Sequence, residues 1–87
     1  MDANWLESFR EKLENHYAWP SLYMFKFIVP DAQREAVKKL FINHTFQEKK
    51  SKQGNYISIS AEMMMPSSQA VIDIYIKASH IEGLIAL

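Results

Sequence analysis

The sequence predicts an α+β domain, in which one antiparallel sheet of four strands carries two helices on one face. Two observations lead to this prediction. Apolar and polar residues alternate from Gly54 to Pro66, which is typical of a strand with one buried face. Patterns of helix and strand also follow one another as helix, strand, helix, strand, strand, helix, strand. Because 87 residues suit one small core, we expect a single domain over 1–87.

An amphipathic helix is predicted first, within an N-terminal segment of residues 1–17. Its apolar residues recur at helical spacing, and Asn4 followed by Glu7 fits a capping box. Pro20 ends the helix, because it restricts Trp19 to extended geometry. The remaining chain, 20–87, forms the predicted core of the domain. The apolar residues of the helix are Trp5, Leu6, Phe9 and Leu13.

The first strand is predicted over Leu22–Val29, and a helix follows it. Lys26 marks one face of this strand as exposed, because an unpaired ammonium is costly to bury. The following helix starts at Pro30–Asp31, where Asp31 can cap the first free amides, and it ends near Asn43–His44. The buried strand face holds Tyr23, Phe25, Phe27 and Val29, the other face holds Leu22, Met24, Lys26 and Ile28, and the apolar stripe of the helix holds Ala36, Val37, Leu40 and Phe41.

The second half repeats this pattern around a hairpin. Thr45–Ser51 is rich in charge, as suits an edge strand. A turn at Lys52–Asn55 then leads into the alternating strand, with Gly54 free to take a positive φ. In that strand Ile57, Ile59, Ala61 and Met63 point inward with Met65, while Tyr56, Ser58, Ser60, Glu62 and Met64 point outward. Ser67 begins a helix that buries Val71, Ile74, Tyr75 and Ala78, and Ile81–Leu87 forms a short last strand.

These elements predict a known topology. A split βαβ order usually gives a ferredoxin-like βαββαβ sandwich, with strand order 4-1-3-2 and both helices on one face. The first and third strands are then central, which agrees with their being the most apolar. The N-terminal helix is an addition to this plan.

Three segments also resemble a known family. The run from Ser51 to Ser60, the Tyr23–Pro30 strand with its central Lys26, and the Ile81–Leu87 ending are similar to the YbeD-like family of small bacterial proteins of unknown function. The resemblance covers residues 20–87. It implies a ferredoxin-like fold similar to amino-acid-binding regulatory (ACT) domains and a connection to lipoate metabolism, and it brings no catalytic residues.

Composition excludes several classes of function. Ten basic residues balance ten acidic ones, so there is no long-range attraction for nucleic acid. The chain has no cysteine, which excludes disulfides, thiolate metal sites and cysteine nucleophiles and fits a reducing compartment. The acidic N-terminus is unlike a signal peptide or a membrane span. We therefore expect a cytoplasmic protein with no membrane partner.

No residues form a recognisable catalytic or metal-binding set. His16, His44 and His80 each fall at the C-terminal end of a predicted helix, where an imidazole can cap free carbonyls. Ser58 and Ser60 have no neighbouring base that would activate a hydroxyl. We therefore expect no enzyme, no metal and no cofactor.

The candidate interaction surface is the outer face of the sheet with the N-terminal helix. It comprises Trp5, Phe9, Lys26, Lys50, Lys52, Tyr56, Ser58, Ser60 and Glu62. Lys26 and Glu62 are predicted to form a cross-strand pair. The apolar helix either closes over its own domain or docks on another subunit.

These observations favour a non-enzymatic regulatory or protein-interaction module, which forms a homo-oligomer or binds another protein through a sheet edge or the open face. The first alternative is a small-ligand sensor for an amino acid or a lipoate-related metabolite. RNA binding through the open face is a remote alternative, because it needs several aromatic platforms and this face offers only Tyr56.

Overall fold

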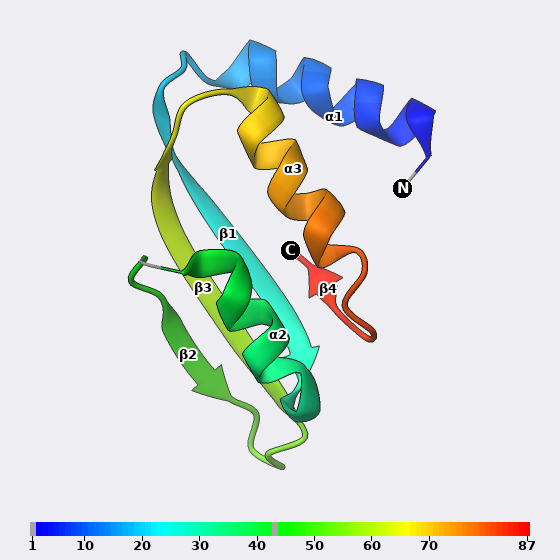
Figure 1. The fold of residues 1–87 in the computed structure, drawn as a ribbon, viewed down its shortest axis with the longest axis vertical. Coiled ribbons are helices and arrows are strands. Elements are labelled where there is room, and N and C mark those ends of the chain that lie inside the picture. Colours follow the sequence, from blue (N-terminus) through cyan, green and yellow to red (C-terminus); the bar gives the residue numbers. More distant parts are fainter. Residues whose placement is uncertain (1, 43) are drawn as a thin grey trace.

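The computed structural model describes residues 2–42 and 44–87. Three helices and a four-stranded antiparallel sheet follow one another in the predicted order (Figure 1). The elements are α1 (Ala3–His16), β1 (Ser21–Pro30), η1 (Asp31–Gln33), α2 (Arg34–Lys38), η2 (Lys39–Phe41), β2 (Gln47–Lys50), β3 (Tyr56–Met65), α3 (Ser68–Ala78) and β4 (Ile85–Ala86).

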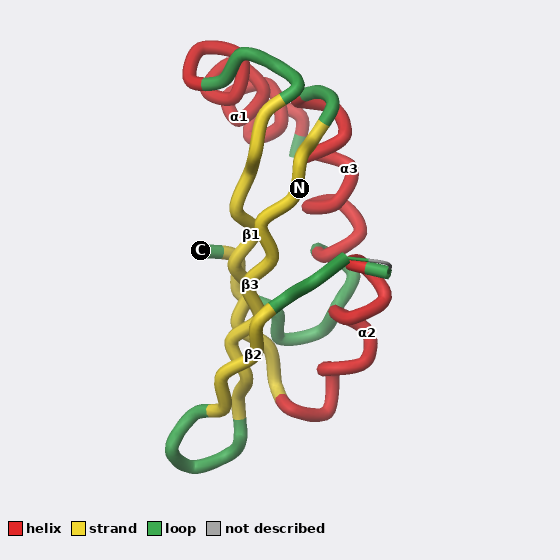
Figure 2. Tube along the Cα trace, turned by 90° about the vertical axis from the view of Figure 1, so that its left-hand side faces the viewer, coloured by secondary structure: helices red, strands yellow, loops and turns green. Residues whose placement is uncertain are grey.

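The sheet has the order β2-β3-β1-β4, which confirms the predicted topology. Its centre is the long pairing of β1 with β3, in which Phe27 lies opposite Ile59 and Leu22 opposite Met64. The short strands β2 and β4 flank this pair. Helices α2 and α3 lie on the same side of the sheet (Figure 2). This is the ferredoxin-like arrangement, with α1 added at one end of the sheet.

The inner face of the sheet forms the core, as the alternation predicts. Phe25, Phe27 and Val29 of β1 and Ile59 of β3 are fully buried. Phe27 stacks on Phe41, with ring centroids 6.0 Å apart, so the segment after β1 closes over this face. The core also holds Val37, Ile57, Ala61, Met63, Met65, Val71, Ile72, Tyr75 and Ala78. Ile72 was not predicted to be buried, and the predicted Ile74 is only partly buried.

The helix α1 packs on α3. Leu13 is buried, Phe9 meets the ring of Tyr75 edge to face at 5.1 Å, and the Ser68 hydroxyl donates to the Glu14 carboxylate. The imidazole of His16 lies 2.8 Å from the carbonyl of Lys12, which confirms its predicted place at the end of the helix.

The predicted cap of α1 is wrong. The side chain of Asp2, not of Asn4, accepts the hydrogen bond from the amide of Trp5 at 2.8 Å. A carboxylate at this position satisfies a free amide and also suits the positive end of the helix dipole. The cap of the helix therefore lies two residues earlier than predicted, and Asn4 lies inside the helix.

The segment after β1 is not one continuous helix. It contains only five residues of α-helix, Arg34–Lys38, between two 3₁₀ turns. Asp31 forms no side-chain cap, and the uncapped ends tighten into 3₁₀ geometry. The helical run ends at Phe41, and the predicted end at Asn43 lies outside the described residues.

The last strand is shorter than predicted. Successive turns occupy residues 79–84, and Gly83 takes a φ of +78° within them. Only Ile85 and Ala86 remain to pair with β1, although the amide of Leu87 donates to the carbonyl of Lys26 at 2.9 Å. Two other local predictions are confirmed. Gly54 takes a positive φ, of +75°, in its turn, and the Ser67 hydroxyl caps α3 by accepting a hydrogen bond from the amide of Ala70.

Candidate interaction face of the sheet

The face of the sheet that points away from α2 and α3 is the candidate site, and it is called the outer face below (Figure 2). Strand alternation places the predicted residues Lys26, Tyr56, Ser58, Ser60 and Glu62 on this face together. The two serines are partly buried, while the other three side chains are exposed. The structure thus gathers five of the nine predicted residues on one surface.

An apolar cluster occupies one end of the outer face. Leu22, Met24 and Met64 are 52%, 50% and 62% exposed, and Leu22 lies directly opposite Met64 in the register of β1 and β3. The sequence placed these residues on this face but did not single them out. The signal was present in the alternation, which turns three large apolar side chains toward solvent beside each other.

The outer face holds most of the exposed large apolar side chains of the described residues. Five of the eight lie on it, and they are Leu22, Met24, Tyr56, Met64 and Ile85. The other three are Trp5, Ile42 and Leu87, and Leu87 lines a hollow with Trp5. Apolar side chains that gather on one face, rather than scatter singly, are typical of a contact surface.

The polar centre of the outer face differs from the prediction in one respect. Lys26 lies opposite Ser60, and Glu62 lies opposite Met24, so Lys26 and Glu62 are diagonal neighbours rather than a facing pair. Among the residues described, every salt bridge involves η1, α2 or the inner side of β2. The predicted Lys26–Glu62 pair is therefore wrong, and both charges face solvent.

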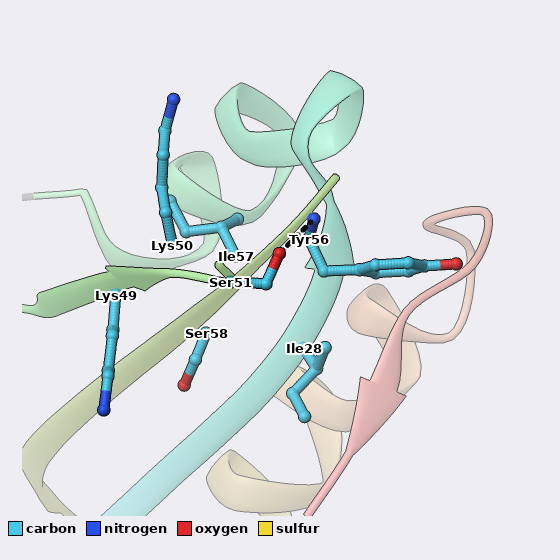
Figure 3. A pocket seen from close by; sticks show the side chains of 7 residues that line it. All are labelled: Ile28, Lys49, Lys50, Ser51, Tyr56, Ile57 and Ser58. Carbon is cyan, nitrogen blue, oxygen red and sulfur yellow. Dashed lines mark hydrogen bonds between the residues drawn. The ribbon is translucent and has the colours of Figure 1, made fainter. Parts of the chain in front are cut away.

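Lys50 does not belong to the outer face. It points to the helical side of the sheet, where its ammonium lies 3.7 Å from the carboxylate of Asp31. Its neighbour Lys49 points the opposite way (Figure 3), because successive side chains of a strand alternate. Lys52 lies exposed in the turn beyond both. The three neighbouring lysines are thus divided among two faces and a turn.

A second ion pair holds β2 to the helical side. The guanidinium of Arg34 donates two hydrogen bonds to the carboxylate of Glu48, at 2.6 and 2.7 Å. The hydrogen bonds to Arg34 lower the pKa of Glu48, and the same contact raises the pKa of Arg34. This pair fixes the edge strand against α2, which leaves the outer face of β2 free.

Shallow hollows lie on the outer face along β2 and β3. One, of about 190 Å³, lies beside Tyr56, Ile28 and Lys49 (Figure 3). The Ser51 hydroxyl accepts from the amide of Tyr56 at 3.3 Å and so holds the start of β3 at this hollow. A neighbouring hollow of about 350 Å³ is lined by Lys26, Lys49 and Ser60 among others. On this face Tyr56 supplies the aromatic ring among the described residues, as the sequence indicated.

Trp5 and Phe9 are not brought to the residues of the outer face. Together with Tyr23 and Tyr75 they line a separate hollow of about 240 Å³ between α1, α3 and the sheet. Phe9 is partly buried against the core, and Trp5 is 44% exposed. Of the two predicted roles for α1, closure over its own domain accounts for Phe9 and Leu13.

The phenols of Tyr23 and Tyr75 meet inside the domain. The hydroxyls of Tyr23 and Tyr75 are 3.0 Å apart, and burial raises the pKa of both phenols. Neither is therefore poised to act as a base. Among residues 2–42 and 44–87, no three His, Asp or Glu side chains converge as metal ligands. No described helix is long and apolar enough to cross a membrane.

The fold and this face define a small α+β domain with one covered and one open sheet surface. The chain belongs to the family described as "Protein of unknown function (DUF493)", whose model matches residues 14–87. This result confirms the resemblance to the YbeD-like family. Searches of curated proteins and of solved structures give no match.

Proposed function

We propose that the protein is a cytoplasmic, non-enzymatic interaction module of regulatory type, which self-associates through the outer face of its sheet. The observation that carries the proposal is the half-exposed cluster of Leu22, Met24 and Met64 on a face that α2 and α3 leave open. Burying such side chains against another protein is favourable by about 25 cal/mol per Å² of apolar surface. The lack of cysteine fits a reducing compartment.

The chemistry of the face supports binding rather than catalysis. Its polar groups are the hydroxyls of Tyr56, Ser58 and Ser60, the amide of Gln47, and the separated charges of Lys26, Lys49 and Glu62. Hydroxyls without an adjacent base are weak nucleophiles. Ion pairs and hydrogen bonds across an interface, in contrast, need only such groups beside an apolar anchor.

Sedimentation equilibrium of the purified protein tests the proposal. The wild type should sediment above the monomer mass as concentration rises. Met64→Glu places a charge in the apolar cluster and should weaken association, while the matched change Gln53→Glu, in the exposed turn, should not. A wild type that stays monomeric at all concentrations contradicts the proposal, as does equal loss in both variants.

The hollow at Tyr56 favours a second function, that of a small-ligand sensor. Its lining, which includes Ile28 and Tyr56, is almost wholly apolar, which suits a ligand with an apolar body. Amino acids, lipoate and nucleotides form the test panel in thermal unfolding. A ligand present at 100 times its Kd stabilises by about 2.7 kcal/mol, which is a shift on the order of 10–20 °C in a domain of this size. No shift with any of them would count against the sensor.

A further inference from the structure

The outer face carries charges of both signs close to its centre, in an arrangement that can match a copy of itself. Lys26 lies on β1 opposite Ser60 of β3, and Glu62 lies two residues beyond Ser60 on the same face of β3. Neither takes part in a salt bridge among the described residues. The chain has no net charge, so two copies meet no overall repulsion.

The apolar cluster can also match a copy of itself. Leu22 and Met64 are direct neighbours across the two strands, so a rotation that exchanges β1 with β3 brings one onto the other. Closed two-fold dimers require such a surface, because each residue pair occurs twice. A two-fold axis that runs along the strands, between β1 and β3, places Leu22 over Met64 and Lys26 over Ser60, about 7 Å along the strand from Glu62 of the other copy.

We propose that two copies stack their outer faces about this two-fold axis, with Lys26 of each copy paired to Glu62 of the other. The proposal rests on the proposed function and deepens it by naming the partner and the contact. Leu22 of one copy then lies over Met64 of the second, and the two sheets pack with aligned strands, as face-to-face sheets commonly do. The apolar ends of both copies merge into one buried cluster.

The size of the face predicts a weak contact. β1 and β3 each span ten residues, which is about 33 Å of strand, and together they are about 10 Å wide, whereas β2 and β4 add only four and two residues. The face thus offers on the order of 400 Å² per copy, or on the order of 800 Å² in all. This area lies below that of standard stable interfaces, so a weak dimer that forms only as concentration rises is expected.

Two reversed charges test the pairing. Lys26→Glu and Glu62→Lys each place like charges opposite one another in a homodimer and should raise its dissociation constant about tenfold. Both residues are exposed, so the fold should persist, and circular dichroism checks this. An equimolar mixture of the two variants restores both opposite-charge pairs. The mixture should therefore form heterodimers about as well as the wild type forms homodimers.

A matched pair of variants separates this effect from net charge. Lys77→Glu and Glu82→Lys change the charge by the same amounts, but Lys77 is on α3 and Glu82 is in the loop after it. Each should dimerise like the wild type, and their mixture should gain nothing. Sedimentation velocity with one partner fluorescently labelled measures the wild type, the four variants and the two mixtures.

The remaining outcomes distinguish a failure of the Lys26–Glu62 pairing from a failure of self-association. If the wild type dimerises but Lys26→Glu and Glu62→Lys do so equally well, the two-fold pairing is overturned while self-association stands. If the control mixture gains as much as the test mixture, the gain reports net charge and the pairing is likewise overturned. If the wild type is monomeric throughout, the pairing and the proposed function fail together.

Discussion

Truncation of Phe27 tests the division of β1 into a buried and an exposed face. Its side chain is fully buried, stacked on Phe41 and edge-on to Tyr75 at 5.7 Å. Phe→Ala changes in a core cost about 3–5 kcal/mol, because apolar transfer and a cavity both contribute. A domain of this length has roughly 5–10 kcal/mol of stability, so Phe27→Ala should remove a large part of it.

Met24→Ala is the matched control, because Met24 lies on the same strand but is half exposed on the outer face. It should change the free energy of unfolding by less than about 1 kcal/mol in the monomer. Urea unfolding followed by circular dichroism measures both variants at low protein concentration. Ile59→Val, opposite Phe27, provides a milder core change of about 0.5–1.5 kcal/mol should Phe27→Ala not fold. Equal losses for Met24→Ala and the core variants would refute the assignment of faces.

Three further predictions concern local contacts. Ser67→Ala removes the cap of α3 and should cost about 1 kcal/mol in urea unfolding, whereas Ser58→Ala on the sheet should cost less; similar costs would contradict the capping role. The pKa of Glu48 is lowered by Arg34, so this contact stabilises the fold above the unfolded pKa of about 4.3 and is lost as pH falls below it. Glu48→Gln should therefore flatten the fall in stability below about pH 4.5, and an unchanged acid profile would refute this. Burial raises the pKa of Tyr75, so its neutral form stabilises the fold below pH 10 and this contribution is lost at higher pH. Tyr75→Phe should therefore reduce alkaline destabilisation, measured by unfolding from pH 8 to 11, and no difference would contradict it.

The sequence was sufficient to predict the sheet because its two central strands have unambiguous patterns. Burial along β3 alternates in step with its apolar and polar residues, and the same holds along β1 from Phe25 to Val29. A shift of one residue in register would turn a whole apolar set to solvent, so such strands have one stable pairing. The strand order then follows from the topology alone.

The ends of the helices were predicted less well, because more than one residue could cap each end. Asp2 and Asn4 are both good capping residues, and only the structure shows that the amide of Trp5 is bonded to Asp2. The segment from Asp31 to Phe41 has a helical pattern, yet its ends lack caps and turn into 3₁₀ geometry. Periodicity does not report such a change, since Val37 and Phe41 are buried in either form.

The candidate site could be predicted only in part. Alternation correctly grouped Lys26, Tyr56 and Glu62, but it could not show which way the edge strand β2 faces. Lys50 was consequently assigned to the open surface, although it pairs with Asp31 on the helical side. That contact depends on how α2 and its flanking turns pack on the sheet, which is a tertiary property.

The most direct test of the open outer face is nuclear magnetic resonance of methyl-labelled methionines with a soluble paramagnetic probe. Met24 and Met64 lie on the outer face, and Met63 and Met65 lie in the core, so one spectrum reports both sides. In dilute protein the probe should broaden Met24 and Met64 strongly and leave Met63 and Met65 sharp. As concentration rises, Met24 and Met64 should become protected. Broadening of Met63 and Met65 to the same degree, or no protection of Met24 and Met64 at any concentration, would contradict the account.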